Sequence, residues 1–148
     1  NPRQDCVCPP SAVAKYRRKI SGPLLDRIDL HVEVPTQSFE KMSSGEGISS
    51  DDVREKVAKA RLLQTKRFRS GEIKTNSEMG LAEIKKFIKT DHLRSVLEMA
   101  YDRHKLSARS YHRLLKVART IADFAGSEEI LPDHLSEALQ FRPKNTSI

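Results

Sequence analysis

Residues 106–126 read LSARSYHRLLKVARTIADFAG, and this stretch decides the fold of the larger part of the chain. Its apolar residues recur at spacings of three and four, the pattern of an α-helix with one broad buried face. Ser107 stands where it can cap the start of this helix, and Gly126 where it can end it. A helix of this kind must pack on neighbours through its apolar positions, which are Tyr111, Leu114, Leu115, Ala118, Ile121, Ala122 and Ala125.

The same spacing recurs on both sides of this helix. We expect further helices over residues 49–68, from Asn76 or Ser77 onward, over 91–104 and over 132–142. Ser49 and Ser50 are candidate caps for the first of them. Val53, Val57 and Ala60 are predicted to form the buried stripe of the first helix. The apolar residues of the others are Met79, Leu81, Ile84, Phe87, Ile88, Leu93, Val96, Leu97, Ala100, Tyr101, Leu135, Ala138, Leu139 and Phe141. Residues 49–142 are therefore predicted to form a helical bundle.

The first part of the chain has a different pattern. Residues 1–10 are rich in proline and predict a loop, and residues 12–20 predict a short helix. Apolar and polar residues then alternate from Ile28 to Val34, which is typical of a half-buried edge strand. One strand cannot satisfy its own backbone, and no comparable strand follows. We therefore expect the partner strands to come from polypeptide that precedes this sequence.

These patterns predict a mainly α protein in four parts. Residues 1–35 form the end of a sheet-containing domain, with a short helix and one edge strand. Residues 36–48 form a flexible linker, because SSGEGISS at 43–50 is polar and contains glycine. Residues 49–142 form the bundle, and residues 143–148 form a disordered tail.

Composition limits the class of protein. The chain has 148 residues, with 27 Lys and Arg against 20 Asp and Glu, and a formal net charge of +7. Such a charge favours contact with polyanions without identifying them. No apolar run approaches the roughly 20 residues of a membrane span. Cys6 and Cys8, the two cysteines, are too close together to close a stabilising loop, and we expect a reducing, cytoplasmic location.

Two arginines stand where a fixed cation would be useful. Arg27 lies on the turn that leads into the predicted strand, and Arg109 lies in the first turn of the long helix, where the helix dipole favours an anion. Simpler interpretations are open for both. Arg27 could pair with the flanking Asp26 and Asp29, and Arg109 could belong to a solvated basic face with Arg113 and Lys116. The sequence contains no glycine-rich phosphate loop, so it is not expected to hydrolyse a nucleotide alone.

The stretches YRRKISGPLLDRIDLHVEVP (16–35), LSARSYHRLLKVARTIADFAGSEEI (106–130) and HLSEALQFR (134–142) resemble the carboxy-terminal half of the magnesium-chelatase-like AAA+ ATPases of the ComM/YifB type. The resemblance covers residues 1–142 and is looser over 35–50 and 69–93. It implies that 1–35 end a nucleotide-binding core and that the bundle is the helical AAA+ lid. It also implies an ATP- and Mg²⁺-dependent ring motor, a hexamer, that acts on DNA as a branch-migration helicase during uptake and recombination.

Carried over to this sequence, the resemblance implies two roles. Arg27 in LLDRID matches the arginine finger, which enters the neighbouring subunit's ATP site. Arg109 in LSAR matches the sensor-2 arginine of the lid, which contacts the γ-phosphate either in its own subunit or across the interface. The phosphate loop and the magnesium-binding acidic motif of the family lie upstream of the matching region. Catalysis is therefore expected of the intact protein, and this segment alone is expected to bind no cofactor.

Two further features leave alternatives open. Cys6 and Cys8 are either two reduced thiols or half of a four-cysteine zinc site, because family members often carry another cysteine pair upstream. The five histidines, His31, His92, His104, His112 and His134, show no ligand spacing.

Two other functions also compete with the motor. One is a stand-alone basic helical module that binds DNA phosphates, and the other is a protein-interaction domain.

Overall fold

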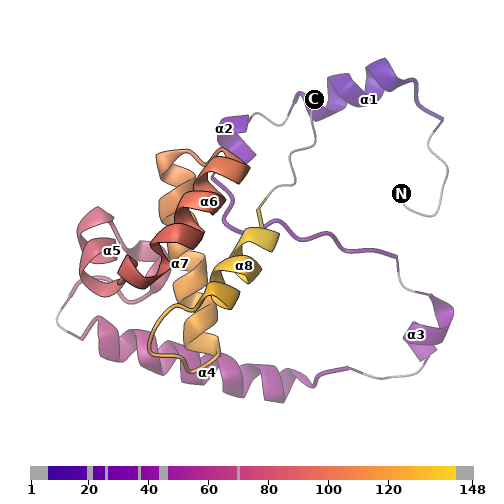
Figure 1. Cartoon of the computed structure of the whole chain (residues 1–148). Coiled ribbons are helices and arrows are strands. Elements are labelled where there is room, and N and C mark those ends of the chain that lie inside the picture. The colour runs from indigo at the N-terminus through magenta and orange to yellow at the C-terminus, as the bar shows by residue number, and fades with distance from the viewer. Residues whose placement is uncertain are drawn as a thin grey trace. The chain divides into compact units, whose positions relative to one another are not determined.

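The computed structural model describes residues 7–19, 22–25, 27–36, 38–43, 47–69 and 71–142. The chain divides into two compact units. Residues 49–141 form the larger unit, and residues 1–48 with 142–148 form the smaller one. Helices are the regular elements of both units in the part of the chain that the structure describes (Figure 1).

In the larger unit, α7 (Ala108–Phe124) is the central helix (Figure 1). It packs against α4 (Ser50–Arg67), α5 (Leu81–Phe87), α8 (Pro132–Gln140) and the 3-10 turn η1 (Asn76–Glu78). A second 3-10 turn, η2 (Asp91–Leu93), leads directly into α6 (Arg94–His104). This arrangement confirms the mainly helical bundle that the apolar spacing predicts.

The core of this unit is built around the apolar face of α7. Its largest fully buried apolar side chains are Met79, Leu93, Leu114, Leu115, Ile130 and Leu135. Burying a side chain of this size contributes about 1.5 to 3 kcal/mol. The face is narrower than predicted, because Tyr111 and Ile121 are only partly buried and Ala125 is exposed.

The ends of α7 follow the predicted capping chemistry. The Ser107 hydroxyl accepts a hydrogen bond from the Ser110 N–H at 3.1 Å. At the other end, Gly126 has φ +68, the left-handed conformation that a glycine adopts without strain. The Gly126 N–H donates to Asp123 O at 3.2 Å, and the Ser127 N–H donates to Ala122 O at 2.9 Å. These two bonds form a Schellman motif, which stops the helix at the predicted glycine.

The helix α4 departs from the predicted burial. Its start is confirmed, since the Ser49 hydroxyl accepts from the Asp52 N–H at 3.1 Å. Ala60 and Gln64 are buried, but Val53 and Val57 are 45% and 38% exposed. The prediction that these two valines are buried is wrong, because the first turns of α4 extend past the helices that cover its second half (Figure 1). Leu81 and Tyr101, two apolar residues of the other helices, are exposed as well.

The smaller unit contains α1 (Pro10–Arg17), α2 (Gly22–Leu25) and α3 (Phe39–Ser43). The helix α1 begins two residues before its predicted start, because the preset backbone of proline suits the first helical position. The helix α3 lies inside residues 36–48, and the linker role of that segment stays a prediction. The Ser43 hydroxyl supports α3 by donating to the carbonyl of Phe39 at 3.0 Å.

The predicted edge strand is not formed. Residues 27–36 contain neither helix nor paired strand in the part of the chain that the structure describes. Ile28, Leu30, Val32 and Val34 are 44%, 50%, 66% and 85% exposed. A strand exists only with a partner that takes up its backbone hydrogen bonds, and this segment has none among the described residues. The origin of its partner strands stays a prediction, and the predicted tail at 143–148 lies outside the described residues.

Candidate functional site

Arg109 lies in the first turn of α7, two residues after the Ser107 cap. Its side chain is exposed, and it forms no ion pair within the residues that the structure describes. The first turn of α7 contains no acidic residue. A cation at the positive end of a helix costs about 0.3 to 1 kcal/mol, so stability does not explain an arginine here. An anion at the same place would be favoured both by the helix and by Arg109.

Three more basic or titratable side chains follow Arg109 along α7. His112, Arg113 and Lys116 are partly buried and continue its face at helical spacing. The Lys116 ammonium donates to the carbonyl of Ser77 at 3.0 Å and so joins α7 to η1. The structure thus places the predicted basic residues on one helix, with Arg109 exposed at its amino end.

Arg27 lies in the smaller unit, on the turn that follows α2. The Arg27 N–H donates to Leu24 O, and the Ile28 N–H donates to Leu25 O, both at 3.0 Å. The ring of His31 bonds to Leu25 O at 3.3 Å through Nε2. The Arg27 side chain is exposed. Asp26, the other predicted partner, lies outside the described residues. The turn is therefore held by backbone bonds, and the guanidinium of Arg27 faces solvent.

A buried ionic cluster in the larger unit was missed by the sequence analysis. Arg67, at the end of α4, donates to both carboxylate oxygens of Asp123, from Nη1 at 2.8 Å and from Nη2 at 2.5 Å. Arg119 Nε donates to the same carboxylate at 3.1 Å, and Asn76 Nδ2 donates to it at 2.7 Å. The Asp123 side chain is fully buried, and that of Arg119 is 4% exposed. One carboxylate thus serves two guanidinium groups.

Arg119 and Arg67 make further hydrogen bonds beyond the carboxylate. Arg119 donates to the carbonyl oxygens of Glu128 at 2.8 Å and Ser127 at 2.6 Å, which fixes the loop between α7 and α8. Arg67 Nη1 also donates to the side-chain oxygen of Asn76 at 2.8 Å. The cluster therefore ties α4, η1, α7 and the α7–α8 loop together, and it gives α7 a fixed position in the bundle.

Electrostatics in the cluster favour its charged state. Burial acts to raise the pKa of Asp123, but hydrogen bonds from Arg67 and Asn76 and the charges of both arginines outweigh it. The pKa of Asp123 consequently lies below its ordinary value. Burial lowers the pKa of Arg119, and the neighbouring Asp123 offsets only part of this effect. The cluster joins largely buried side chains of three elements, and we assign it a structural role. Its signal in the sequence is the pair Arg119 and Asp123, which interrupts the apolar face of α7 at i, i+4 spacing.

The metal-ligating residue types do not gather in the structure. Among the described residues, no three His, Cys, Asp or Glu side chains are grouped so that they could hold a metal ion. Cys8 is an exposed free thiol, and Cys6 lies outside the described residues, so the possible zinc half-site stays untested. His134 is buried, and its Nδ1 accepts from the Leu131 N–H at 3.1 Å at the start of α8. No helix in the described part of the chain is long and apolar enough to cross a membrane.

Comparison with known proteins gives matches over nearly the whole chain. Residues 47–142 match the family model for the carboxy-terminal domain of the magnesium chelatase subunit ChlI, and residues 1–42 match the model for the magnesium chelatase subunit ChlI. Competence protein ComM of Haemophilus influenzae is 42% identical over 136 residues, which are 90% of this chain and 26% of ComM. YifB of Escherichia coli is 38% identical over 138 residues, 91% of this chain and 26% of YifB.

An uncharacterised protein of Mycobacterium tuberculosis is 38% identical over 140 residues, which cover 94% of this chain and 28% of that protein. The chain thus spans about a quarter of the length of the curated relatives it matches. The two family models together cover both the segment that contains the Arg27 turn and the helical bundle. Because the carboxy-terminal family model covers well over half of its residues, this chain belongs to the magnesium-chelatase-like AAA+ proteins that include ComM and YifB.

Proposed function

We propose that this chain is the carboxy-terminal part of an ATP-driven ring motor in which Arg109 is the sensor-2 arginine. Arg27 is the arginine finger, which enters the ATP site of the neighbouring subunit. The observation that carries the proposal is the place of Arg109, an exposed cation at the positive end of α7 with no acidic residue in its turn. That end of the helix suits the terminal phosphate of a nucleotide.

The chemistry of phosphoryl transfer explains why two arginines are needed. Negative charge spreads over the transferring phosphoryl group, and fixed cations aimed at it lower the barrier. A guanidinium stays ionised and bridges two oxygens, which a lysine ammonium does not do. An arginine finger accelerates hydrolysis about a thousandfold to a hundred-thousandfold in comparable enzymes. Because Arg27 acts on the adjacent subunit, hydrolysis would depend on assembly of the ring.

The lid is suited to transmit the nucleotide state. Asp123 lies fourteen residues after Arg109, roughly 21 Å along the same helix. The buried cluster fixes the far end of α7 to α4 and to the α7–α8 loop. A force on Arg109 from a bound phosphate would therefore move the bundle as one body. We propose that this is how phosphate binding at Arg109 is coupled to motion of the bundle.

ATP and Mg²⁺ are the ligands of the proposed motor. We propose that the metal and the body of the nucleotide are held by the phosphate loop and the acidic motif that the family carries upstream of the matching region. This chain would supply the two cations at the phosphates. DNA is the proposed substrate, because the net charge of +7 favours a polyanion and because one relative is called a competence protein. We propose a hexameric, cytoplasmic branch-migration helicase.

The test uses the intact protein. Arg27→Ala is expected to keep ATP affinity and to lower turnover at least a hundredfold, and Arg109→Ala is expected to change both nucleotide affinity and turnover. Arg61→Ala and Arg103→Ala are matched controls, since both are exposed arginines to which the proposal assigns no role. ATP binding and steady-state hydrolysis are measured for all four variants. Unchanged turnover in Arg27→Ala would reject the finger role, and unchanged binding and turnover in Arg109→Ala would reject the sensor role.

The basic face of α7 favours a second candidate function, a DNA-binding module without an ATPase role. Arg113 and Lys116, both partly buried, continue the basic face of α7 that begins at Arg109. This function predicts a DNA complex that weakens steeply with salt and does not respond to nucleotide. Loss of that complex in a variant lacking Arg109, Arg113 and Lys116, together with normal hydrolysis, would favour it over the motor. A protein-interaction domain would instead show a copurifying partner.

A further inference from the structure

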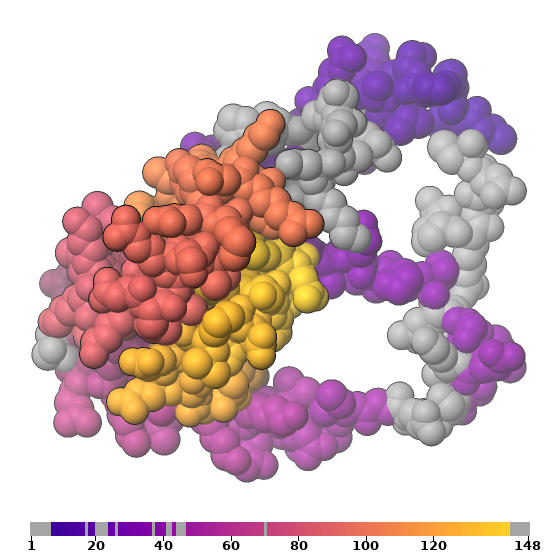
Figure 2. All heavy atoms as spheres, viewed as in Figure 1, coloured from indigo at the N-terminus to yellow at the C-terminus, as the bar shows by residue number. Residues whose placement is uncertain are grey.

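A hollow of about 290 Å³ opens on the α6 side of the larger unit. It is lined by Asp91 of η2, by Arg94, Glu98, Tyr101 and Asp102 of α6, and by Tyr111 of α7. The helix α6 lies on the near face of the bundle in Figure 2. We refer to this feature as the α6 hollow. It belongs entirely to the larger unit and is separate from the exposed side chain of Arg109.

The α6 hollow carries a net negative charge, whereas the chain as a whole is basic. Arg94 Nε donates to Glu98 Oε1 at 2.9 Å, so one carboxylate is neutralised. Asp91 and Asp102 form no ion pair within the residues that the structure describes. Two carboxylates therefore remain to attract a cation at a surface of a protein whose net charge is +7.

The walls of the α6 hollow are aromatic as well as acidic. The rings of Tyr101 and Tyr111 meet edge to face, with centroids 6.4 Å apart. Tyr101 is 46% exposed, and Tyr111 is partly buried, which raises the pKa of its phenol and keeps it neutral. Tyrosine faces beside carboxylates bind guanidinium and ammonium groups. The chemistry of the hollow thus suits an arginine or lysine side chain.

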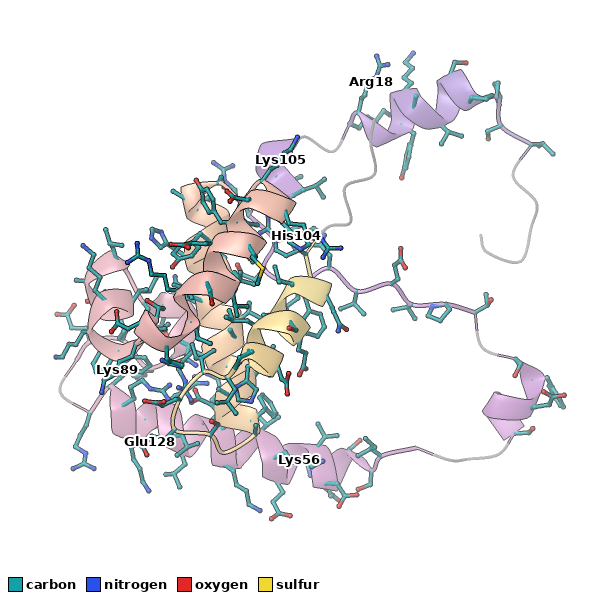
Figure 3. The ribbon with its side chains drawn as sticks, viewed as in Figure 1. Arg18, Lys56, Lys89, His104, Lys105 and Glu128 are labelled. Atoms are coloured by element: carbon teal, nitrogen blue, oxygen red, sulfur yellow. The ribbon has the colours of Figure 1, made fainter. Side chains whose placement is uncertain are left out.

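We propose that the α6 hollow binds the basic end of α1 from a second copy of this chain, with Arg18 as the inserted side chain. Lys15, Arg18 and Lys19 are exposed, and residues 10–19 contain no acidic residue (Figure 3 labels Arg18). The two surfaces are complementary in charge, and they lie on different units of the chain. A head-to-tail contact of two different surfaces is the kind that closes a ring.

The choice of a neighbouring copy rests on the proposed function. There Arg27 reaches the adjacent subunit, and Arg18 precedes Arg27 by nine residues. The segment that carries the finger would then bring α1 to the lid of the same neighbour. Contact between α1 and the α6 hollow would hold the finger segment in place before ATP arrives. The contact adds an assembly surface that does not touch the nucleotide.

The test is a charge exchange in the intact protein, with assembly followed by sedimentation velocity over a range of concentrations. Asp91→Lys with Asp102→Lys is expected to raise the concentration for half-assembly about tenfold, because opposed charges at an interface become like charges. Arg18→Glu with Lys19→Glu is expected to do the same. Combining all four substitutions is expected to restore most of the assembly. Glu128→Lys with Glu137→Lys is the matched control, since it changes exposed acidic residues outside the hollow by the same charge.

Three results would overturn the proposal. They are unchanged assembly in either pair, an equal loss in the control pair, and no recovery in the exchanged protein. Thermal unfolding of each variant separates a folding defect from an assembly defect, and Tyr101→Phe keeps the ring and is expected to assemble normally. Monomeric wild-type protein would reject the proposed ring motor. If the wild type is oligomeric and these substitutions leave its assembly unchanged, this inference alone is rejected.

Discussion

Asp123 of α7 accepts two hydrogen bonds from the guanidinium of Arg67, at 2.8 and 2.5 Å, although 56 residues separate them in the sequence. The same carboxylate accepts from Arg119 within α7 at 3.1 Å. Removing the carboxylate would leave two arginines, both largely buried, without their counter-ion. The bundle depends on this side chain more than on any exposed ion pair of α4 or α6, where the partners are mostly solvated.

We therefore predict that Asp123→Ala lowers the free energy of unfolding by about 3 to 5 kcal/mol, the usual cost of leaving a buried charge without its partner. Urea denaturation followed by circular dichroism measures the change. Asp133→Ala is the control, because Asp133 is exposed in the first turn of α8 and is expected to matter by less than about 1 kcal/mol. Equal losses in the two variants would show that the cluster contributes no special stability.

The pH dependence of stability should carry the signature of Asp123. Its pKa is lowered in the fold, so its contribution is present above the ordinary aspartate pKa of about 3.9. That contribution is lost as the pH falls through the lower pKa of the folded state. The stability difference between the wild type and Asp123→Asn is expected to be constant above about pH 5 and to shrink below about pH 4. A difference that stays constant down to the acid transition would contradict the assignment.

A substitution at Lys105 is expected to raise the free energy of unfolding, in contrast to Asp123→Ala. Lys105 ends α6 with φ 45, a left-handed conformation that is strained for a residue with a side chain (Figure 3). Lys105→Gly is expected to raise the free energy of unfolding by about 0.5 to 1 kcal/mol. Lys105→Ala is the matched control, because it removes the ammonium but keeps the strained backbone. If both variants are stabilised equally, the effect comes from the charge and not from the backbone.

The cap of α7 can be tested separately from Arg109. Ser107→Ala removes the acceptor for the Ser110 N–H and is expected to cost about 1 kcal/mol. Ser107→Asp keeps an acceptor at the helix start and is expected to retain most of the stability. Ser95→Ala, an exposed serine in the first turn of α6, is the control and should lie within about 0.5 kcal/mol of the wild type. Thermal unfolding of the wild type and the three variants gives the order of their stabilities.

The parts of the fold that depend on local chemistry could be predicted from the sequence. Ser107, Gly126 and Pro132 mark the ends of α7 and the start of α8, because capping and turn preferences act within a few residues. The exposed place of Arg109 follows from the same local pattern. The burial of Val53 and Val57 could not be predicted correctly, since helical spacing identifies an apolar stripe but not which parts of it are covered.

The remaining errors concern contacts between distant residues. The segment from Ile28 to Val34 has the alternation of a strand, but pairing depends on a partner that periodicity cannot supply. The buried cluster could not be predicted for a related reason. Arg119 and Asp123 resemble surface charges on a helix until Arg67, far away in the chain, is brought to them. A charged pair inside an otherwise apolar face is the sign that could have revealed it.

The unequal count of charges in the cluster has a consequence for how sequences of this family can drift. Loss of either guanidinium still leaves the carboxylate with a counter-ion, and Arg67→Met is the milder step, because Arg119 also donates to the carbonyl oxygens of Ser127 and Glu128. Loss of Asp123 before loss of either arginine is strongly destabilising, because both cations then stay buried and repel each other. Neutral evolution through this site must therefore pass through a one-arginine intermediate, and a homologue with two arginines and no acid at these places should not persist.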